Sequence, residues 1–404
     1  MKIIGGGVCA AKGFKANGIH CGVRKNRSKK DLSLIVSEEL ASCAAVYTTN
    51  LVYGAPITVT REHLKNGKAK ACICNSGIAN TCCTGGVEVA ERISAGIAAK
   101  LGCSADDIVI ASTGIIGQPL DPEPIEKGFD ELVSGLSENG SDDAEAGIMT
   151  TDTVKKEIAF EFTVGGKTCR IGGIAKGSGM IHPNMATMLV FITSDVAISP
   201  ALLQKALSND IKNTFNMLSV DGDTSTNDMV TVLCNGLAGN EEITEENEDF
   251  AEFMKVLNSV NVHLCRMIAA DGEGATKMLE CSVTGAKTKE DAKKVAKSVV
   301  CSSLLKAAMF GADANWGRVL CAIGYSGAEV DVKGIAVSFE SAAGKISVCK
   351  AGMGIEFSEE LAKKVLSEKE INIIVELSDG DFDSTAWGCD LTYDYVKING
   401  DYRS

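Results

Sequence analysis

The sequence is poor in histidine, aromatic residues and positive charge, and each shortage argues against a class of function. Only four histidines occur in 404 residues, and the sixteen cysteines include no Cys-x-x-Cys pair, so the usual spacings of a zinc site are missing. Aromatic residues make up 5% of the chain, too few for a surface that stacks nucleic-acid bases. The 40 Lys and Arg against 53 Asp and Glu leave a net charge of -13, which disfavours nucleic acid and anionic membranes. We therefore expect small-molecule partners, with no metal, no nucleic acid and no membrane.

The N-terminus has no long hydrophobic run. Its apolar stretch, 3–11, is too short and too rich in glycine to form the core of a signal peptide, and Lys12 and Lys15 follow it. The cysteines are spread over a long chain rather than concentrated in a small one, so we expect them to be reduced and to serve as small core residues. Both observations favour a cytoplasmic protein.

The chain is long enough for two or three domains, and with 45% hydrophobic residues it can bury their cores. Short β-branched runs alternate with helical patterns without a strict strand-helix-strand repeat, which predicts a layered α/β fold of the α+β kind. We expect a main domain at 1–281 and a smaller C-terminal α/β domain at 282–404. The predicted strands are 55–60, 69–74, 107–112, 157–164, 168–173, 334–339, 345–349 and 371–377. The predicted helices are 87–101, 200–218 and 288–310, with a solvated acidic helix face at 241–249.

Local turn and cap signals support several of these elements. Gly165-Gly166-Lys167 separates two predicted strands and is typical of a hairpin turn. Thr288 and Asp291 are spaced as a capping pair at the start of a helix, and Gly311 is expected to end that helix.

The segment 176–190 (Lys-Gly-Ser-Gly-Met-Ile-His-Pro-Asn-Met-Ala-Thr-Met-Leu-Val) places Thr187 between a glycine-rich loop and a predicted buried strand. A threonine hydroxyl becomes a nucleophile only when a base takes its proton, and the most economical base is the threonine's own α-amino group. That amine titrates near pH 7.7 to 8.0, which suits a general base at neutral pH. The hypothesis is a self-processing enzyme, cut between Ala186 and Thr187. The alternative is an ordinary strand residue beside a loop.

Several blocks resemble, in order, the ornithine acetyltransferase family, also called the glutamate N-acetyltransferase family, and together they span nearly the whole chain. They are Lys-Gly-Ser-Gly-Met-Ile with Ala-Thr-Met-Leu in 176–189, Ala-Ala-Val-Tyr-Thr-Thr-Asn at 44–50, Asn-Ser-Gly-Ile-Ala-Asn at 75–80, Ser-Thr-Gly-Ile-Ile-Gly at 112–117, Met-Thr-Thr-Asp-Thr at 149–153, Asp-Gly-Asp-Thr-Ser-Thr-Asn-Asp at 221–228, Gly-Ala-Asp-Ala-Asn-Trp-Gly-Arg at 311–318 and the ending Ile-Asn-Gly-Asp-Tyr-Arg-Ser. Small departures from the family pattern are Ile78, Gly400 and Arg403.

The resemblance implies a fold shared with self-processing aminopeptidases, with the catalytic chemistry in the main domain. It implies an α chain, 1–186, and a β chain that starts at 187, assembled as a heterotetramer of two α and two β chains, with the C-terminal end returning to the active site. Thr187 would be the nucleophile, and Thr113 with Gly114, in a turn leaving the strand 107–112, would be the oxyanion pair. The residues matched to the family's substrate contacts are Thr153, Lys176, Thr187, Glu273, Asn399 and Ser404.

The activity implied by the resemblance is a two-step acetyl exchange in arginine biosynthesis. Thr187 takes acetyl from N-acetylornithine, and glutamate then accepts it, without an organic cofactor. Bifunctional members of the family also accept acetyl-CoA. The sequence lacks a phosphate-binding loop, which favours the exchange-only form, although bifunctional members have no recognisable loop either. Two alternatives stay open: a self-processing N-terminal-threonine aminopeptidase or amidase that releases acyl groups to water, and an uncut binding or assembly protein.

Three other patterns are weaker than they look. Gly166-Lys167-Thr168 ends like a phosphate loop, but Glu161 stands where its first glycine is required. The block 221–228 resembles a calcium loop, but Thr226 occupies the position of the turn glycine, so a hydrogen-bonded turn is the better interpretation. His182 is a conceivable base, but an N-terminal amine makes it unnecessary, and we interpret it as structural.

Overall fold

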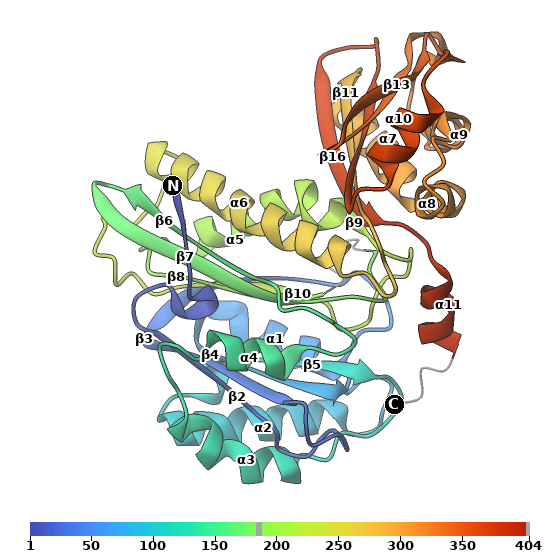
Figure 1. The fold of residues 1–404 in the computed structure, drawn as a ribbon. Coiled ribbons are helices and arrows are strands. Elements are labelled where there is room, and N and C mark those ends of the chain that lie inside the picture. Colours follow the sequence, from blue (N-terminus) through green and yellow to red (C-terminus); the bar gives the residue numbers. More distant parts are fainter. Residues whose placement is uncertain (183–187, 401–404) are drawn as a thin grey trace. The chain divides into compact units, whose positions relative to one another are not determined.

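The computed structural model describes residues 1–182 and 188–400 (Figure 1). The chain divides into two compact units. The first unit consists of Met1–Gly177, Pro183–Lys212 and Thr224–Leu264, and the second consists of Ser178–His182, Asn213–Asp223 and Cys265–Ser404. The boundary expected at residue 282 falls inside the strand β11 (Met278–Ala286), whose partner strands all belong to the second unit. The second unit therefore begins earlier, at Cys265, and takes in two short preceding segments.

A nine-stranded sheet forms the centre of the first unit. Its strands, in spatial order, are β1 (Lys2–Ile4), β6 (Glu157–Val164), β7 (Lys167–Lys176), β8 (Leu189–Ser194), β10 (Met229–Cys234), β3 (Leu32–Tyr47), β4 (Lys68–Ile78) and β5 (Ile108–Ile115), with β2 (Phe14–Ile19) paired to β3. The pairs β8/β10 and β4/β5 are parallel, and the others are antiparallel. The predicted hairpin of β6 and β7 is confirmed, with a two-residue turn at Gly165 and Gly166.

Helices cover both outer faces of this sheet, which folds over so that β6 to β10 lie above β3 to β5 (Figure 1). The covering helices are α1 (Ala55–His63), α2 (Gly86–Leu101), α3 (Glu123–Ser134), α5 (Pro200–Asp210) and α6 (Glu248–Ala270), the last of which continues into the second unit. The helix α4 (Ser141–Ile148) instead packs into the core between the two layers of strands. Successive strand residues face different cores: Ile73 packs toward α2 and α3, whereas Cys72 and Cys74 pack against the overlying strands. The layered α/β class is confirmed.

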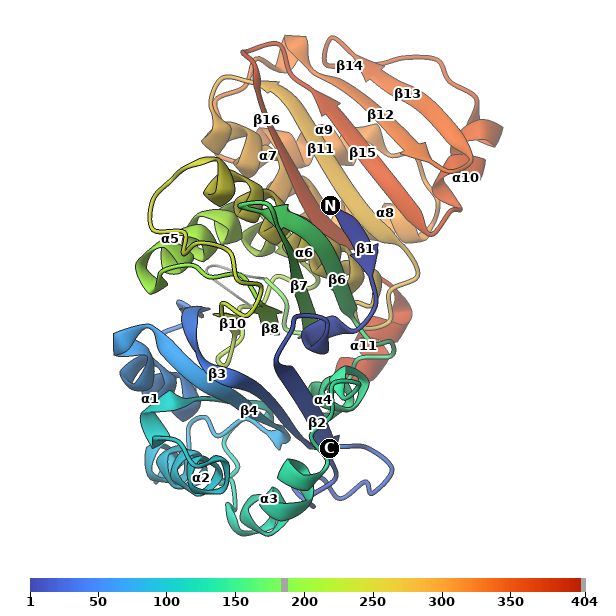
Figure 2. The same ribbon diagram turned by 90° about the vertical axis from the view of Figure 1, so that its left-hand side faces the viewer.

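The second unit has its own seven-stranded sheet, seen with its helices in Figure 2. Its strand order is β14 (Met353–Gly354), β13 (Gly344–Lys350), β12 (Ala336–Ser341), β15 (Glu370–Glu376), β11, β16 (Phe382–Cys389) and β9 (Leu218–Ser219). Its helices are α7 (Lys289–Cys301), α8 (Ser303–Phe310), α9 (Trp316–Gly324), α10 (Glu359–Leu366) and α11 (Tyr393–Gly400). The three strands predicted in this region correspond to β12, β13 and β15, and the sequence did not reveal β11 or β16.

One predicted strand is wrong: 55–60 belongs to the helix α1. Pro56 in the first turn is well placed to start a helix, and the β-branched run behind it suggested a strand instead. The Thr60 hydroxyl donates to the Ile110 carbonyl at 2.8 Å and accepts from the Ile110 amide at 2.9 Å. Packing against β5 therefore overrides the local strand propensity.

Two predicted helices are interrupted. The helix predicted at 200–218 ends at Asp210, whose carboxylate accepts hydrogen bonds from Asn258 and Asn261 of α6. The helix predicted at 288–310 has the expected Thr288 cap but breaks at Ser302, whose hydroxyl caps the separate helix α8. Most of the acidic stretch at 241–249 is exposed coil that precedes α6, so that prediction of a helix face is also wrong.

Cysteine is used as a core residue, as predicted. Nine of the sixteen cysteines are buried, and all sixteen are free thiols. Burial raises the pKa of buried thiols such as Cys43, Cys74 and Cys72, the last to about 12, so these thiols stay protonated and unreactive. Within residues 1–182 and 188–400, no helix is long and apolar enough to span a membrane.

Candidate functional site

Thr113 and Gly114 lie inside β5 and not in a turn after it, because the strand extends to Ile115. Gly114 is paired with Gly77 of β4 and has a φ of 131°, a conformation that favours glycine. A Cβ at Gly114 would lie 2.3 Å from the Gly77 carbonyl carbon, so only glycine fits. The expected oxyanion pair therefore sits on a rigid strand at the edge of the sheet.

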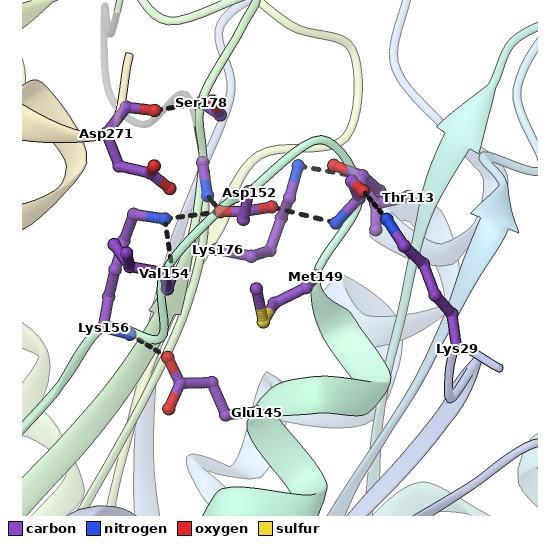
Figure 3. Close-up of polar contacts among 12 residues, drawn as sticks. Lys29, Thr113, Glu145, Met149, Asp152, Val154, Lys156, Lys176, Ser178 and Asp271 are labelled. Carbon is purple, nitrogen blue, oxygen red and sulfur yellow. Dashed lines mark hydrogen bonds and ion pairs between the residues drawn. The ribbon is translucent and has the colours of Figure 1, made fainter. Parts of the chain in front are cut away.

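Lys176 ends β7 and reaches Thr113 (Figure 3). Its Nζ donates to the Thr113 Oγ1 at 3.4 Å, and both residues are buried, Lys176 being 8% exposed. An ammonium group has only donors, so Thr113 acts as the acceptor in this contact and its own hydroxyl hydrogen can point elsewhere. The structure thus brings together two of the residues singled out in the sequence.

Asp152 holds the backbone around Lys176 in place. One carboxylate oxygen accepts from the Gly177 amide at 2.7 Å and from the Lys156 Nζ at 2.7 Å, and the other accepts from the Thr150 amide at 2.9 Å. Burial by itself would raise the pKa of Asp152, but the charges of Lys156 and Lys176 outweigh it and hold that pKa well below its ordinary value. Asp152 is therefore a permanent carboxylate, paired with a fully buried lysine.

Glu145 of α4 lies beside Lys156 (Figure 3). It is 0% exposed, and one of its carboxylate oxygens accepts a hydrogen bond from the Lys156 backbone amide. Burial raises the pKa of Glu145 to about 7, with a further contribution from the charge of Glu157. This group therefore changes charge near neutral pH.

We expect Glu145→Gln to remove a pH dependence of stability. The pKa of Glu145 is higher in the folded chain than the 4.5 of an unperturbed glutamate, so the folded chain binds more protons between about pH 4.5 and 7. Stability from this group is lost as pH rises through that window. The free energy of unfolding of the variant relative to the native chain should rise from pH 5 to 8 by about 1–3 kcal/mol. Urea unfolding at both pH values measures it, with Glu138→Gln on the surface as control; a constant difference would contradict the expectation.

The side chain of Asn227 links β5 to the loop before β10 through hydrogen bonds. Its Nδ2 donates to the carbonyl oxygens of Ala79 at 2.6 Å and Ser112 at 2.9 Å, and its Oδ1 accepts from the hydroxyls of Thr81 and Thr226 at 2.6 Å each. The Ser112 carbonyl belongs to the same planar peptide group as the Thr113 amide, so this bond fixes the orientation of the peptide group that precedes Thr113.

Asp228, the next residue, is also buried. The Ser225 hydroxyl hydrogen-bonds its carboxylate, and the Lys176 charge acts on it. Sequence reasoning did not single out Asn227, Asp228, Lys156 or Glu145, which the structure places around Thr113 and Lys176. The first two lie in the block 221–228 that carries the family resemblance, which is the one signal that pointed to them.

The second unit holds a separate pair of predicted substrate residues. Asn399 on α11 donates through its Nδ2 to the Glu273 Oε2 at 2.8 Å. Glu273 is 8% exposed, and a Cβ at Gly179 would lie 2.3 Å from its carboxyl carbon, so any larger residue at 179 would displace the Glu273 carboxylate. The Glu273 amide also donates to the Ser178 carbonyl at 2.9 Å. The Lys-Gly-Ser-Gly loop therefore packs directly against Glu273.

His182 and Asp221 have structural contacts in the same unit. The His182 Nδ1 is 3.0 Å from the Ser219 hydroxyl, and burial together with the charges of Lys297 and Lys306 lowers its pKa to about 4. Asp221 accepts from the amides of residues 180, 181 and 223, which makes the start of the 221–228 block a hydrogen-bonded turn. Within the described parts of the chain, no cluster of three or more His, Cys, Asp or Glu has the arrangement of a metal site.

Comparison with known proteins places these residues in a family. The ArgJ family matches residues 15–404. The arginine biosynthesis bifunctional protein ArgJ of Caldanaerobacter subterraneus subsp. tengcongensis is 50% identical over 406 residues and is matched over 100% of both chains. The arginine biosynthesis bifunctional protein ArgJ 1 of Clostridium acetobutylicum is 49% identical. The match covers 97% of this chain and 96% of that protein. This chain belongs to the ArgJ family. It is an enzyme.

A solved ArgJ structure agrees with this membership. The crystal structure of the arginine biosynthesis bifunctional protein ArgJ from Bacillus halodurans is 49% identical to this chain, with a TM-score of 0.50. It is matched over 98% of its own chain but covers only 52% of this one. The solved ArgJ chain is thus about half as long as the chain described here.

Four site residues predicted from the sequence remain to be located. Thr153 is exposed, in the segment between α4 and β6. Ala186, Thr187 and Ser404 lie outside the described residues. The first described residue after the expected junction is Met188, whose carbonyl accepts from the Met229 amide at 2.8 Å.

Proposed function

We propose that this enzyme transfers acetyl groups in arginine biosynthesis. Thr187 accepts acetyl from N-acetylornithine and releases ornithine; glutamate then takes the acetyl and leaves as N-acetylglutamate. The match to the ArgJ family over 15–404 carries the proposal, because every matched substrate and oxyanion position falls within it. A covalent intermediate suits this reaction, since the acetyl waits on the threonine while one amino acid replaces the other.

Self-cleavage between Ala186 and Thr187 would create this nucleophile. It would divide the 404 residues into an α chain of 186 and a β chain of 218. The half-length chain of the solved Bacillus halodurans relative supports such a division. We extend the proposal to a heterotetramer of two α and two β chains in the cytoplasm, a reducing setting that suits sixteen free thiols.

In the proposed reaction, each residue matched to the family has a role. Thr113 and Gly114 donate hydrogen bonds to the oxyanion that forms when acetyl is transferred. The Lys176 ammonium pairs with an α-carboxylate, and the Glu273 carboxylate pairs with an amine. Thr153, Asn399 and Ser404 complete the substrate contacts. No organic cofactor takes part.

A second donor, acetyl-CoA, also belongs in the proposal. The sequence favours the exchange-only form, but the relatives at about 50% identity are named bifunctional proteins. A self-processing aminopeptidase or amidase remains the alternative activity; it would use the same nucleophile and oxyanion strand but would transfer acyl groups to water. An uncut binding protein would need neither the contact between Lys176 and Thr113 nor a glycine at 114.

Exchange between N-acetylornithine and glutamate should proceed without coenzyme A, because a single covalent site carries the acetyl in a ping-pong cycle. Parallel double-reciprocal lines are expected, with one acetyl mass added to the 187–404 fragment when N-acetylornithine is given alone. Glutamate with acetyl-CoA should also give turnover; its absence would restrict the enzyme to exchange. Hydrolysis of N-acetylornithine without any need for glutamate would identify the amidase, and no acetylated fragment with either donor would refute the transferase.

A further inference from the structure

The densest positive charge of this acidic chain lies in the loop between β2 and β3. Residues 24–30 (Arg-Lys-Asn-Arg-Ser-Lys-Lys), here called the basic loop, hold five basic residues and no acidic one, and no other seven consecutive residues hold as many basic ones. The whole chain has 53 acidic against 40 basic residues, so the basic loop is a local exception to its charge. A surface of one sign attracts ligands of the other, and the ligand for this loop is an anion.

Three of the five basic side chains have no carboxylate partner among the residues that the structure describes. Lys25 and Arg27 are exposed and take part in no hydrogen bond or ion pair there. Lys29 is exposed too, and its Nζ lies 3.5 Å from the Thr150 carbonyl oxygen, a neutral acceptor. Lys30, by contrast, is paired with an aspartate of α4. The positive charge of the other three side chains is therefore available to a bound anion.

Asp31 holds the basic loop in a fixed shape. Its buried carboxylate accepts hydrogen bonds from the amides of residues 21, 22 and 24, at 2.6, 3.2 and 2.8 Å. Within the loop, the Asn26 Oδ1 accepts from the amide and the hydroxyl of Ser28, at 3.0 and 2.8 Å. A loop that is ordered before binding loses less conformational entropy when a ligand binds.

Arg24 connects the basic loop to the strands that carry the predicted oxyanion pair. Its guanidinium donates to the Met149 carbonyl at 2.5 Å. A Cβ at Gly77 of β4 would lie 2.8 Å from the Arg24 Cγ, so the stem of this side chain packs against the strand. Gly77 is the strand partner of Gly114 in β5. The loop therefore begins beside the oxyanion pair.

Lys29 connects the other end of the loop to the same site. The residue whose carbonyl it approaches, Thr150, donates its amide hydrogen to Asp152 at 2.9 Å. Asp152 also accepts from the amide that follows Lys176, and the Lys176 Nζ donates to Thr113 (Figure 3). The basic loop thus lies next to the site around Thr113, within the same unit of the chain.

Acetyl-CoA is the anion of the proposed reaction that suits this position. Glutamate and N-acetylornithine have a carboxylate close to their reacting atoms, and Lys176 is the cation proposed to pair with it. Coenzyme A instead carries its charge on a diphosphate and a ribose phosphate, which a long neutral arm separates from the thioester. Its phosphates must therefore bind beside the reaction site and not inside it. Arginine and lysine side chains form charge-assisted hydrogen bonds with phosphate oxygens.

We propose that the basic loop binds the phosphate groups of coenzyme A, with Lys25 and Arg27 as the main contacts. The proposal rests on the proposed function, in which acetyl-CoA is the second acetyl donor. It gives the chain a way to recognise this donor without a glycine-rich phosphate loop, because exposed cations take the place of backbone amides.

Isothermal titration of the purified native protein with coenzyme A tests the proposal, because it measures binding without turnover. Lys25→Gln combined with Arg27→Gln should raise the dissociation constant about tenfold or more. Lys363→Gln combined with Lys364→Gln on α10 is the matched control, since it removes the same charge from an exposed pair. It should change the dissociation constant by about twofold or less, because distant surface charges are screened. All four side chains are exposed, so both variants should fold.

The kinetics of acetyl exchange separate coenzyme A from other anions. In exchange with N-acetylornithine, the KM for glutamate should be the same in the Lys25 and Arg27 double variant as in the native enzyme. A rise in this KM as large as the loss of coenzyme A affinity would show a general attraction of anions and would overturn the proposal.

Equal affinity of the native protein and the double variant for coenzyme A would overturn the proposal too, as would a native enzyme that performs the exchange but does not bind coenzyme A. A native protein that binds coenzyme A through the basic loop but transfers no acetyl group would refute the proposed function and leave the binding site standing.

Discussion

A chain carrying Thr187→Ala should stay a single polypeptide of 404 residues, whereas the native chain should separate under denaturing conditions into pieces of 186 and 218 residues. Cleavage by an N-to-O acyl shift requires the threonine hydroxyl, and acetyl transfer requires the same oxygen and the freed amine. The alanine variant should therefore lose both cleavage and exchange completely. Intact mass and N-terminal sequencing, which should begin at Thr187 in the native β chain, measure the first loss.

Thr187→Ser is the matched control for this prediction, because it keeps a hydroxyl at the same position. It should still be cut between 186 and 187 and should still become acetylated. Cleavage of the alanine variant at this bond would remove the basis for the assignment of Thr187.

Thr113→Ala should lower kcat for acetyl exchange by about 100-fold or more, which corresponds to roughly 2.7–4 kcal/mol of lost transition-state stabilisation. The Lys176 ammonium donates to the Thr113 hydroxyl oxygen, so the hydroxyl hydrogen is available for the developing oxyanion. That charge exists only in the transition state, and KM should change much less than kcat.

Steady-state kinetics on fully cleaved enzyme provide the measurement, with Thr113→Ser as the control that retains the hydroxyl. The serine variant should keep most of the native kcat. A native kcat in the alanine variant would show that groups other than Thr113 donate to the oxyanion. A change confined to KM would show that Thr113 contacts the substrate instead.

Local signals in the sequence predicted local structure well. The hairpin at Gly165 and Gly166 and the Thr288 cap depend on neighbouring residues alone, so their sequence patterns were sufficient. The strand predicted at 107–112 was also correct but too short, because β5 continues through Thr113 and Gly114. Its extension depends on pairing with β4, more than thirty residues earlier in the chain.

The sequence by itself determined the fold class, the reduced cysteine core and membership of the family, since ordered blocks over the whole chain retain this information. It also pointed to Thr113 and Lys176, but it did not show that they touch. Only the tertiary structure decided that 55–60 is helical, that Asp152 is paired with a buried lysine and that the Asp228 carboxylate is buried beside β10. These features arise from packing and electrostatics between segments far apart in the chain. Burial changes the free energy of a charge or a hydrogen bond there. No local pattern of residues shows which distant segments become neighbours.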